Sequence, residues 1–109
     1  MANPRLTPHS IQLVGQRFRA LAEPARLKLL QSMRRGEMTV TDLVNETRLG
    51  QANVSKHLQL LHSHGFVTRR KNGLFTYYAL ADDSVFALCE IVCDRINADA
   101  RARSRVMSS

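Results

Sequence analysis

The amino-acid sequence predicts a single, mainly α-helical domain with one β-hairpin, an α+β fold. Apolar residues recur at steps of three and four along most of the chain, which is the spacing of helices that are buried on one face. Near residue 66 the pattern changes to two β-prone runs around Asn72-Gly73. The length of 109 residues is that of one small domain.

Two helices are predicted before residue 36. The first has one apolar face, made of Ile11, Val14, Phe18 and Leu21. Pro24 suits the first turn of the second helix, where its missing N–H group has no helical partner to lose. Gly36 then ends the apolar pattern of the second helix.

A third helix is predicted over residues 40–47 and a fourth over residues 51–63. Thr39, followed three residues later by Asp42, is typical of a capping box in which Asp takes the place of Glu. The connector between the two helices, residues 48–50, is short and contains a glycine. Two short helices joined in this way indicate a helix-turn-helix.

A β-hairpin is predicted directly after the fourth helix. The β-prone runs 66–71 and 74–80 flank Asn72-Gly73, and both of these residues tolerate the positive φ of a type I′ turn. A basic hairpin beside a helix-turn-helix is a wing, placed to contact the DNA backbone. The order of four helices, two strands and a further helix is therefore that of a winged helix-turn-helix.

A fifth helix is predicted from about residue 82 to residue 98. Its apolar face consists of Val85, Leu88, Cys89, Val92, Cys93 and Ile96. We expect residues 99–109 to form a flexible basic tail. The single domain then spans residues 1–109, with a folded core over about residues 9–98.

Positive charge is concentrated in the predicted helix-turn-helix and wing. The chain has 16 Lys and Arg against 9 Asp and Glu, a formal charge of +7. No acidic residue lies between Thr47 and Ala81, whereas five basic residues do: Arg48, Lys56, Arg69, Arg70 and Lys71. This distribution favours nucleic acid as the partner.

Other classes of protein fit the sequence less well. The chain has no apolar run of the roughly 18 residues that a membrane span needs, and no leader-like hydrophobic stretch at its start. We therefore expect a cytoplasmic protein without a membrane partner. We expect no enzyme, because the sequence has no nucleophile motif, phosphate-binding glycine loop or clustered acid–base pair.

Three blocks of the sequence occur in the order and spacing of a known family: residues 21–30 (LAEPARLKLL), residues 54–61 (VSKHLQLL), and Asn72-Gly73 followed by residues 77–80 (YYAL). Over about residues 11–98 the chain resembles the ArsR/SmtB family of winged helix-turn-helix transcriptional repressors. The resemblance implies a homodimer formed through the first and fifth helices. It also implies that two recognition helices enter successive major grooves of an inverted-repeat operator in double-stranded DNA.

The resemblance further implies which residues contact DNA. On the fourth helix and the wing they are Gln51, Asn53, Ser55, Lys56 and His57, with Arg69, Arg70 and Lys71. Among these we expect Gln51 and Ser55 to contact bases. A second interpretation stays open for the helix, because any surface helix has a polar outer face, and His57 could instead orient its neighbours beside the core.

The common metal sites of the family are not reproduced here. Thr39-Val40-Thr41 stand where thiol-type sensors carry cysteines, and of the positions matching the zinc site only the first fits: Asp82, Ser84, Arg95 and Ala98. Cys89 and Cys93, four apart on the fifth helix, are the remaining candidates for sensing. They predict As(III) or another thiophilic metal ion as inducer, with no cofactor required.

Alternatives stay open for the thiols and for the fold. The thiols could form a redox or persulfide switch, or pack as small hydrophobic side chains, or meet across a dimer axis as a group of four. If they sense, the ligand would favour a dimer whose recognition helices no longer match the operator. The fold could also serve as a protein-interaction module without specific DNA binding.

Overall fold

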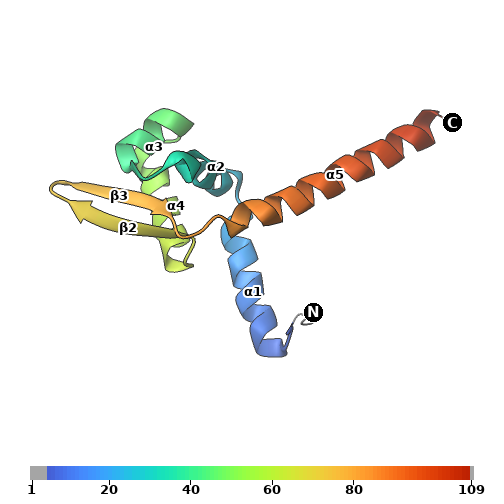
Figure 1. The fold of residues 1–109 in the computed structure, drawn as a ribbon, viewed down its shortest axis with the longest axis horizontal. Helices are drawn as coiled ribbons and strands as arrows, with labels where there is room; N and C mark the ends of the chain where they lie inside the picture. The colour runs from blue at the N-terminus through green and yellow to red at the C-terminus, as the bar shows by residue number, and fades with distance from the viewer. Residues whose placement is uncertain (1–4, 109) are drawn as a thin grey trace.

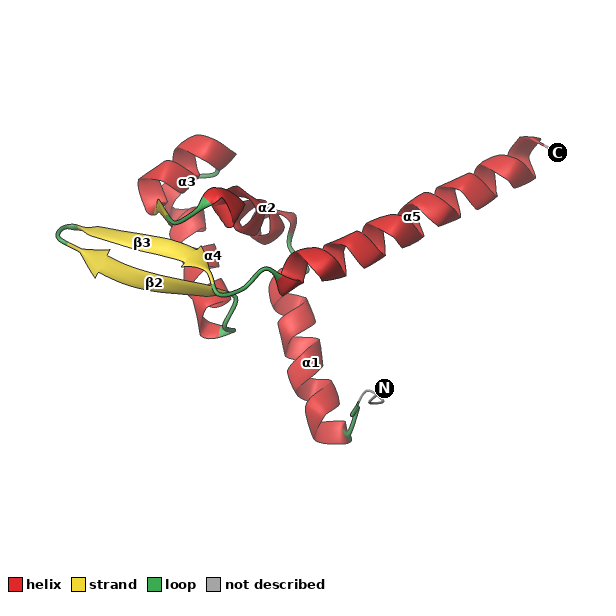
Figure 2. Ribbon diagram, viewed as in Figure 1, coloured by secondary structure: helices red, strands yellow, loops and turns green. Residues whose placement is uncertain are grey.

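The computed structural model describes residues 5–108, and its elements follow the predicted order (Figures 1 and 2). Residues 1–4 and 109 of the predicted domain lie outside the described residues. The elements are α1 (Pro8–Leu21), α2 (Pro24–Ser32), the 3-10 helix η1 (Met33–Arg35), β1 (Met38–Thr39), α3 (Val40–Thr47), α4 (Gln51–Ser63), β2 (Val67–Asn72), β3 (Phe75–Leu80) and α5 (Ser84–Ser108). The predicted α+β fold, mainly helical with a hairpin wing, is confirmed.

The hairpin belongs to a three-stranded antiparallel sheet with the order β1-β3-β2. In β1, Met38 pairs with Tyr78 of β3, and in β2, Val67 pairs with Leu80 of β3. The sequence did not predict β1, because a strand of two residues is too short to show the alternation that identifies strands. β1 attaches the middle of β3 to the start of α3.

The turn of the hairpin differs from the prediction. Asn72 pairs with Phe75, so Gly73 and Leu74 form the two-residue loop. Gly73 has a φ of 64°, and among the described non-glycine residues only Arg48 has a positive φ. A positive φ at the first loop residue alone is the pattern of a II′ turn, so the predicted type I′ turn on Asn72-Gly73 is wrong. The register agrees with the burial of Val67 and Tyr78 on one face of the sheet.

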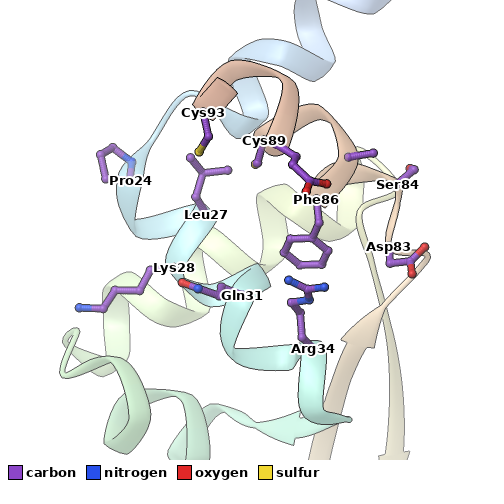
Figure 3. A pocket seen from close by; sticks show the side chains of 12 residues that line it. Pro24, Leu27, Lys28, Gln31, Arg34, Asp83, Ser84, Phe86, Cys89 and Cys93 are labelled. Carbon is purple, nitrogen blue, oxygen red and sulfur yellow. The ribbon is translucent and has the colours of Figure 1, made fainter. Parts of the chain in front are cut away.

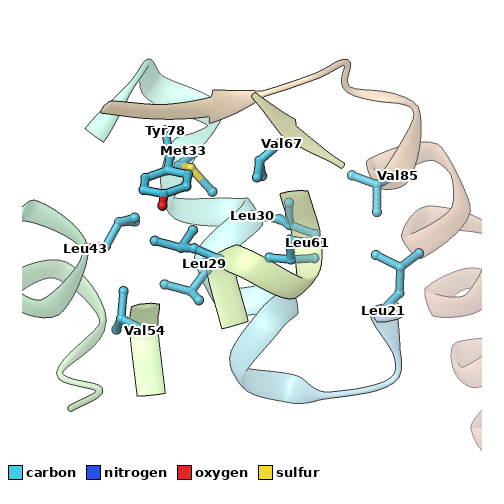
Figure 4. Packing of buried hydrophobic residues seen from close by; sticks show 11 residues of the cluster. Leu21, Leu29, Leu30, Met33, Leu43, Val54, Leu61, Val67, Tyr78 and Val85 are labelled. Carbon is cyan, nitrogen blue, oxygen red and sulfur yellow. The ribbon is translucent and has the colours of Figure 1, made fainter. Parts of the chain in front are cut away.

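The hydrophobic core lies between helices α2 to α4 and one face of the sheet (Figure 4). Leu29, Leu43, Val54, Leu58 and Leu61 are fully buried. The other core members are Leu21, Leu30, Met33, Val67, Tyr78 and Val85. This core fixes α3 and α4 relative to the wing, and it gives α1 and α5 one anchoring residue each.

Helices α1 and α5 project from this body in different directions (Figure 1). The radius of gyration of the Cα atoms is 17.2 Å, whereas a compact domain of this length has a radius of about 13 Å. In the described part of the chain, none of the helices combines the length and the hydrophobicity that crossing a membrane requires. The two projecting helices leave large apolar side chains in solvent.

The segment after Ala98 is helical, where we had predicted a flexible tail. Helix α5 continues to Ser108. Alanine and arginine alternate along residues 100–103, and both are strong helix formers. Arg95 Nε also lies 3.4 Å from Asp99 Oδ1, a favourable pair one turn apart. High local helix propensity therefore extends the helix beyond the point where its apolar face ends.

Candidate nucleic-acid interface and thiol pair

The start of helix α3 is fixed by the predicted capping box. The Asp42 amide donates to Thr39 Oγ1 at 3.1 Å, and the Thr39 amide donates to Asp42 Oδ2 at 3.0 Å. Two amide groups at the helix start, which have no partner within the helix, are satisfied in this way. The box also sets the direction in which α3 leaves the sheet, because Thr39 is part of β1.

Arg48 forms the sharp corner between α3 and α4. Its φ is 64°, and its amide donates to the Val44 carbonyl at 2.8 Å. Glycine is the usual residue in this left-handed conformation, because it has no Cβ to crowd the backbone. Gly50, with extended backbone, precedes the first residue of α4. The predicted helix-turn-helix is confirmed.

The outer face of α4 is polar and available to a ligand. Val54, Leu58 and Leu61 are buried under the helix. Gln51, Asn53, Lys56 and Gln59 are exposed, and Ser55 is half-buried. Among residues 5–108, the side chains of Gln51, Asn53, Ser55, Lys56 and Gln59 make no hydrogen bond or ion pair within the chain. Their donors and acceptors are therefore free for base edges and phosphates.

His57 lies on the other flank of α4, where it is half-buried against α2. Arg26 Nη1 donates to His57 Nδ1 at 3.3 Å. The same guanidinium donates from Nε to the Ala20 carbonyl at 2.5 Å and from Nη2 to the Arg19 carbonyl at 3.1 Å. His57 thus takes part in a connection between α4 and the corner of α1 and α2. This geometry favours the orienting interpretation of His57 over a base contact.

The surroundings of His57 also change its titration. Desolvation by burial lowers the pKa of His57 below its usual 6.5, and the neighbouring Arg26 lowers it further. Glu23 opposes this change and Lys56 adds to it. The neutral imidazole is therefore favoured, which lets Nδ1 accept the hydrogen bond from Arg26.

The three basic wing residues lie on two different faces of the hairpin. Side chains alternate along a strand, so Arg69 and Lys71 share the face of Tyr78, whereas Arg70 shares the face of Tyr77. Arg70 donates from Nε to Glu37 Oε2 at 2.9 Å, and its Nη2 bonds Glu37 Oε1. The Arg70 guanidinium also lies 4.7 Å from the centre of the Tyr77 ring.

These interactions make Arg70 different from its two basic neighbours. The hydrogen bonds from Arg70 hold the pKa of Glu37 below its usual value. Within the described residues, Arg69 and Lys71 have no such partner. Arg69 and Lys71 are therefore the cations of the wing that a phosphate can engage without breaking an existing pair.

Leu74 forms the tip of the wing and is fully exposed. Phe75 beside it is 57% exposed. Neither residue was among the predicted DNA contacts. The sequence does mark Leu74 as unusual, because polar residues and glycine dominate hairpin loops. The tip of the wing, which follows the basic strand β2, is therefore apolar.

Cys89 and Cys93 both line an open groove between α2 and the beginning of α5 (Figure 3). The groove has a volume of about 840 Å³. Both thiols are free, with Cys89 half-buried and Cys93 exposed, and Figure 3 shows the Cys93 sulfur directed toward Leu27. The predicted placement of both cysteines on one side of a helix is thus present.

The rest of the groove is a mixture of apolar and charged side chains. Phe86 stands at its centre, with the Arg34 guanidinium 4.3 Å from the centre of the ring. Leu27 and Gln31 form the α2 wall. In residues 5–108 there is no group of three or more His, Cys, Asp or Glu side chains able to hold a metal ion. The two thiols thus have no third protein ligand in the described part of the subunit.

The chain is similar to known regulators. A model of the family described as bacterial regulatory protein, arsR family, matches residues 23–69. The chain is 33% identical over 81 residues to the arsenical resistance operon repressor of Bacillus subtilis, which covers 72% of this chain and 77% of that protein. It is 36% identical over 85 residues to a transcriptional repressor SmtB homolog of Synechocystis sp., covering 78% of this chain and 64% of the relative.

A further relative is the probable mercury resistance operon repressor of Streptomyces lividans. Identity is 44% over 68 residues, covering 62% of this chain and 54% of the relative. The chain thus matches less than two thirds of the length of the Synechocystis and Streptomyces proteins. The descriptions of these relatives are those of repressors, which confirms the prediction of a non-enzymatic family.

Solved structures show the same fold. NolR from Sinorhizobium fredii superimposes with a TM-score of 0.72 at 29% identity, covering 85% of this chain and 95% of NolR. The homodimeric winged helix-turn-helix DNA-binding domain Mb0332 from Mycobacterium bovis also gives a TM-score of 0.72 at 29% identity, covering 86% and 90% of the two chains. The predicted winged helix-turn-helix is therefore confirmed.

Proposed function

This chain belongs to the ArsR family of bacterial regulatory proteins, and on that premise we propose that it is a cytoplasmic, homodimeric transcriptional repressor that binds an inverted-repeat operator. The observation that carries the proposal is the unpaired polar face of α4 beside the basic face of the wing. Gln51 and Ser55 contact bases, Asn53 and Lys56 assist them, and Arg69 and Lys71 bind phosphates. His57 and Arg70 position these elements.

The dimer forms through α1 and α5. Large apolar side chains on both helices are exposed, with Phe18 at 53% and Ile91 at 66%. The others are Ile11, Leu13, Val14, Leu88, Val92 and Ile96. An apolar surface of this kind, on two helices that project from the core, is typical of a subunit interface. A two-fold axis through it presents two α4 helices to one face of DNA.

The thiols of Cys89 and Cys93 receive a thiophilic inducer, of which As(III) is the leading candidate. Relatives are described as repressors of arsenical and of mercury resistance operons, and thiolates are the ligands that such soft ions prefer. The groove lies between α5 and α2, and α2 packs on α4. In the proposed dimer, α5 also forms part of the subunit interface. A ligand in the groove favours a dimer in which the helix-turn-helix stands at a different angle to the subunit interface. The two α4 helices then no longer match the operator, and the protein is released.

The test is a fluorescence-anisotropy titration of the reduced protein on its own upstream DNA. Arsenite, zinc, cadmium and a persulfide donor are added separately to wild type and to a Cys89→Ser/Cys93→Ser variant. Release of wild type but not of the variant by arsenite supports the proposal. Release by the persulfide donor alone shows a redox switch of the same fold, and equal behaviour of both proteins with every agent assigns the cysteines to packing.

The same titration tests DNA binding itself. A repressor prefers one operator over unrelated DNA by a large factor, whereas binding of equal strength to all sequences contradicts the proposal. Such an outcome would favour a winged helix that meets an acidic protein partner instead.

A further inference from the structure

We propose that the ligand of Cys89 and Cys93 is a trivalent arsenical carrying one organic substituent, with the arsenic held by both thiolates and the substituent lying in the groove between α2 and α5. The inference deepens the proposed function and rests on it for its regulatory consequence. It joins two observations, the number of thiols and the size of the space beside them.

The number of thiols matches this ligand. Trivalent arsenic is pyramidal and takes three bonds, so inorganic arsenite needs three thiolates to be fully bound by protein. An arsenical with one carbon substituent needs only two. Residues four apart on a helix have Cβ atoms about 5–6 Å apart, which lets both sulfurs reach one atom. In the described part of the chain no third ligand stands near the pair.

The groove supplies the space that a bare ion would not use. Its volume of about 840 Å³ falls within the roughly 300–1,000 Å³ of small-molecule sites. Leu27 and Phe86 offer apolar surface beside the sulfurs (Figure 3). An aromatic or other apolar substituent on arsenic can therefore contact these side chains while the arsenic stays on the thiols.

The thiols are directed away from the centre of the exposed apolar stripe of α5. Each residue turns an α-helix by about 100°, so Cys89 and Cys93 lie at the edge of this stripe nearest Ile96, about 100° around the axis from Leu88 and Val92 respectively. Leu88 and Val92 are exposed, whereas the thiols line the groove toward α2. This orientation favours a site within one subunit over a cluster of four cysteines at the dimer axis.

The chemistry of binding is an exchange without oxidation or reduction. Two As–O bonds of an organoarsonous acid break and two As–S bonds form. Each thiol proton leaves with a hydroxide as water, so one arsenical and two thiols give one dithioarsenite and two waters. Arsenic stays trivalent throughout, and no further reactant is required.

The experiment compares three probes on the reduced protein in buffer without added thiols: phenylarsine oxide, inorganic arsenite and Hg(II). We expect one phenylarsine per subunit by intact-protein mass spectrometry, with loss of both titratable thiols. Either single variant, Cys89→Ser or Cys93→Ser, should weaken phenylarsine binding roughly 100-fold, because the second bond is then lost. Arsenite should bind more weakly than phenylarsine oxide.

A second pair of variants tests the groove separately from the thiols. Gln31 is exposed on the α2 wall and makes no side-chain hydrogen bond among the described residues. Gln31→Trp should fill the groove and weaken phenylarsine binding about tenfold or more, while Hg(II), which needs only two sulfurs, keeps its affinity. Gln31→Ala is the matched control and should bind phenylarsine like wild type. Circular dichroism verifies that each variant is folded.

Three results would overturn the inference. They are equal affinity for arsenite and phenylarsine oxide, one arsenic bound by thiols of two subunits, and phenylarsine binding that Gln31→Trp does not change. The proposed function is tested independently, because operator binding of the ligand-free protein is measured before any probe is added. A protein that binds phenylarsine but no operator would contradict the function and leave the site intact.

Discussion

At the scale of single residues, the wing shows how pairing within the protein decides which cation is available to DNA. Arg70 is engaged with Glu37 and Tyr77, and both members of the ion pair are about half exposed. An exposed pair of this kind contributes little to stability, because water screens the two charges. Its main effect is to keep the Arg70 guanidinium engaged with Glu37 and Tyr77, on the face of the hairpin opposite to Arg69 and Lys71.

This difference predicts unequal effects of two alanine substitutions. Arg69→Ala should weaken operator binding and lower the slope of log affinity against log salt concentration by about 1 per subunit, because one phosphate contact is lost. Arg70→Ala should change that slope less. Anisotropy titrations at several salt concentrations measure both values. A larger loss for Arg70→Ala would show that the ion pair with Glu37 opens on DNA.

His57 gives a pH dependence of stability. Its pKa is lowered in the folded protein, so the unfolded chain binds the proton more readily. The stabilisation is therefore complete above the unfolded pKa of 6.5 and is lost as the pH falls through the folded value. From about pH 7 to about pH 5 the free energy of unfolding of wild type should fall more steeply than that of His57→Gln. Urea unfolding at matched protein concentration measures this, and parallel pH profiles would refute it.

Residue chemistry alone predicted some of these features and could not predict others. The capping pair Thr39 and Asp42 is local, so its spacing identified it. The roles of His57 and Arg70 depend on Arg26 and Glu37, which are distant in the sequence and meet them only in the fold. A local sequence pattern cannot predict pairs between distant residues. For that reason the sequence could not show which of the eight predicted DNA contacts already have a partner within the protein.

At the scale of elements, the capping box controls how α3 begins and so how the helix-turn-helix sits on the wing. Thr39→Ala removes the acceptor of the Asp42 amide and should lower the free energy of unfolding by about 1 kcal/mol. Thr41→Ala is the matched control, since Thr41 is exposed inside α3 and should cost nothing. Urea denaturation measures both. Equal stability of the two variants would show that the sheet alone fixes the start of α3.

The ends of helices were predictable where capping or turn residues agreed with the apolar periodicity. Helices α3 and α4 have their predicted ends, because Thr39 and Gly50 mark their starts. The helical extension of α5 was missed because its apolar face stops before its helix propensity does. The loop residues of the hairpin were misplaced by one position, since the register follows the burial of Val67 and Tyr78 rather than the strongest turn dipeptide.

At the scale of the whole molecule, a single copy of the chain leaves a large apolar surface exposed on α1 and α5. The exposed apolar faces of α1 and α5 together with the large radius of gyration indicate that a partner covers them. Ile91→Glu places a charge in this surface and should convert the proposed dimer to a monomer with much weaker operator binding. Asn97→Glu, on the polar side of α5, should remain dimeric. Sedimentation equilibrium measures both, and a dimeric Ile91→Glu protein would move the interface elsewhere.

The central claim is that a two-fold dimer reads two half-sites through its α4 helices. The most direct test is selection of operators from a random pool of double-stranded DNA, followed by affinity measurements on the selected site with altered spacing. We predict an inverted repeat bound by one dimer, and a large loss of affinity when about 5 base pairs, half a helical turn, are inserted between the half-sites. Selection of no repeat, or affinity unaffected by the insertion, would contradict the account.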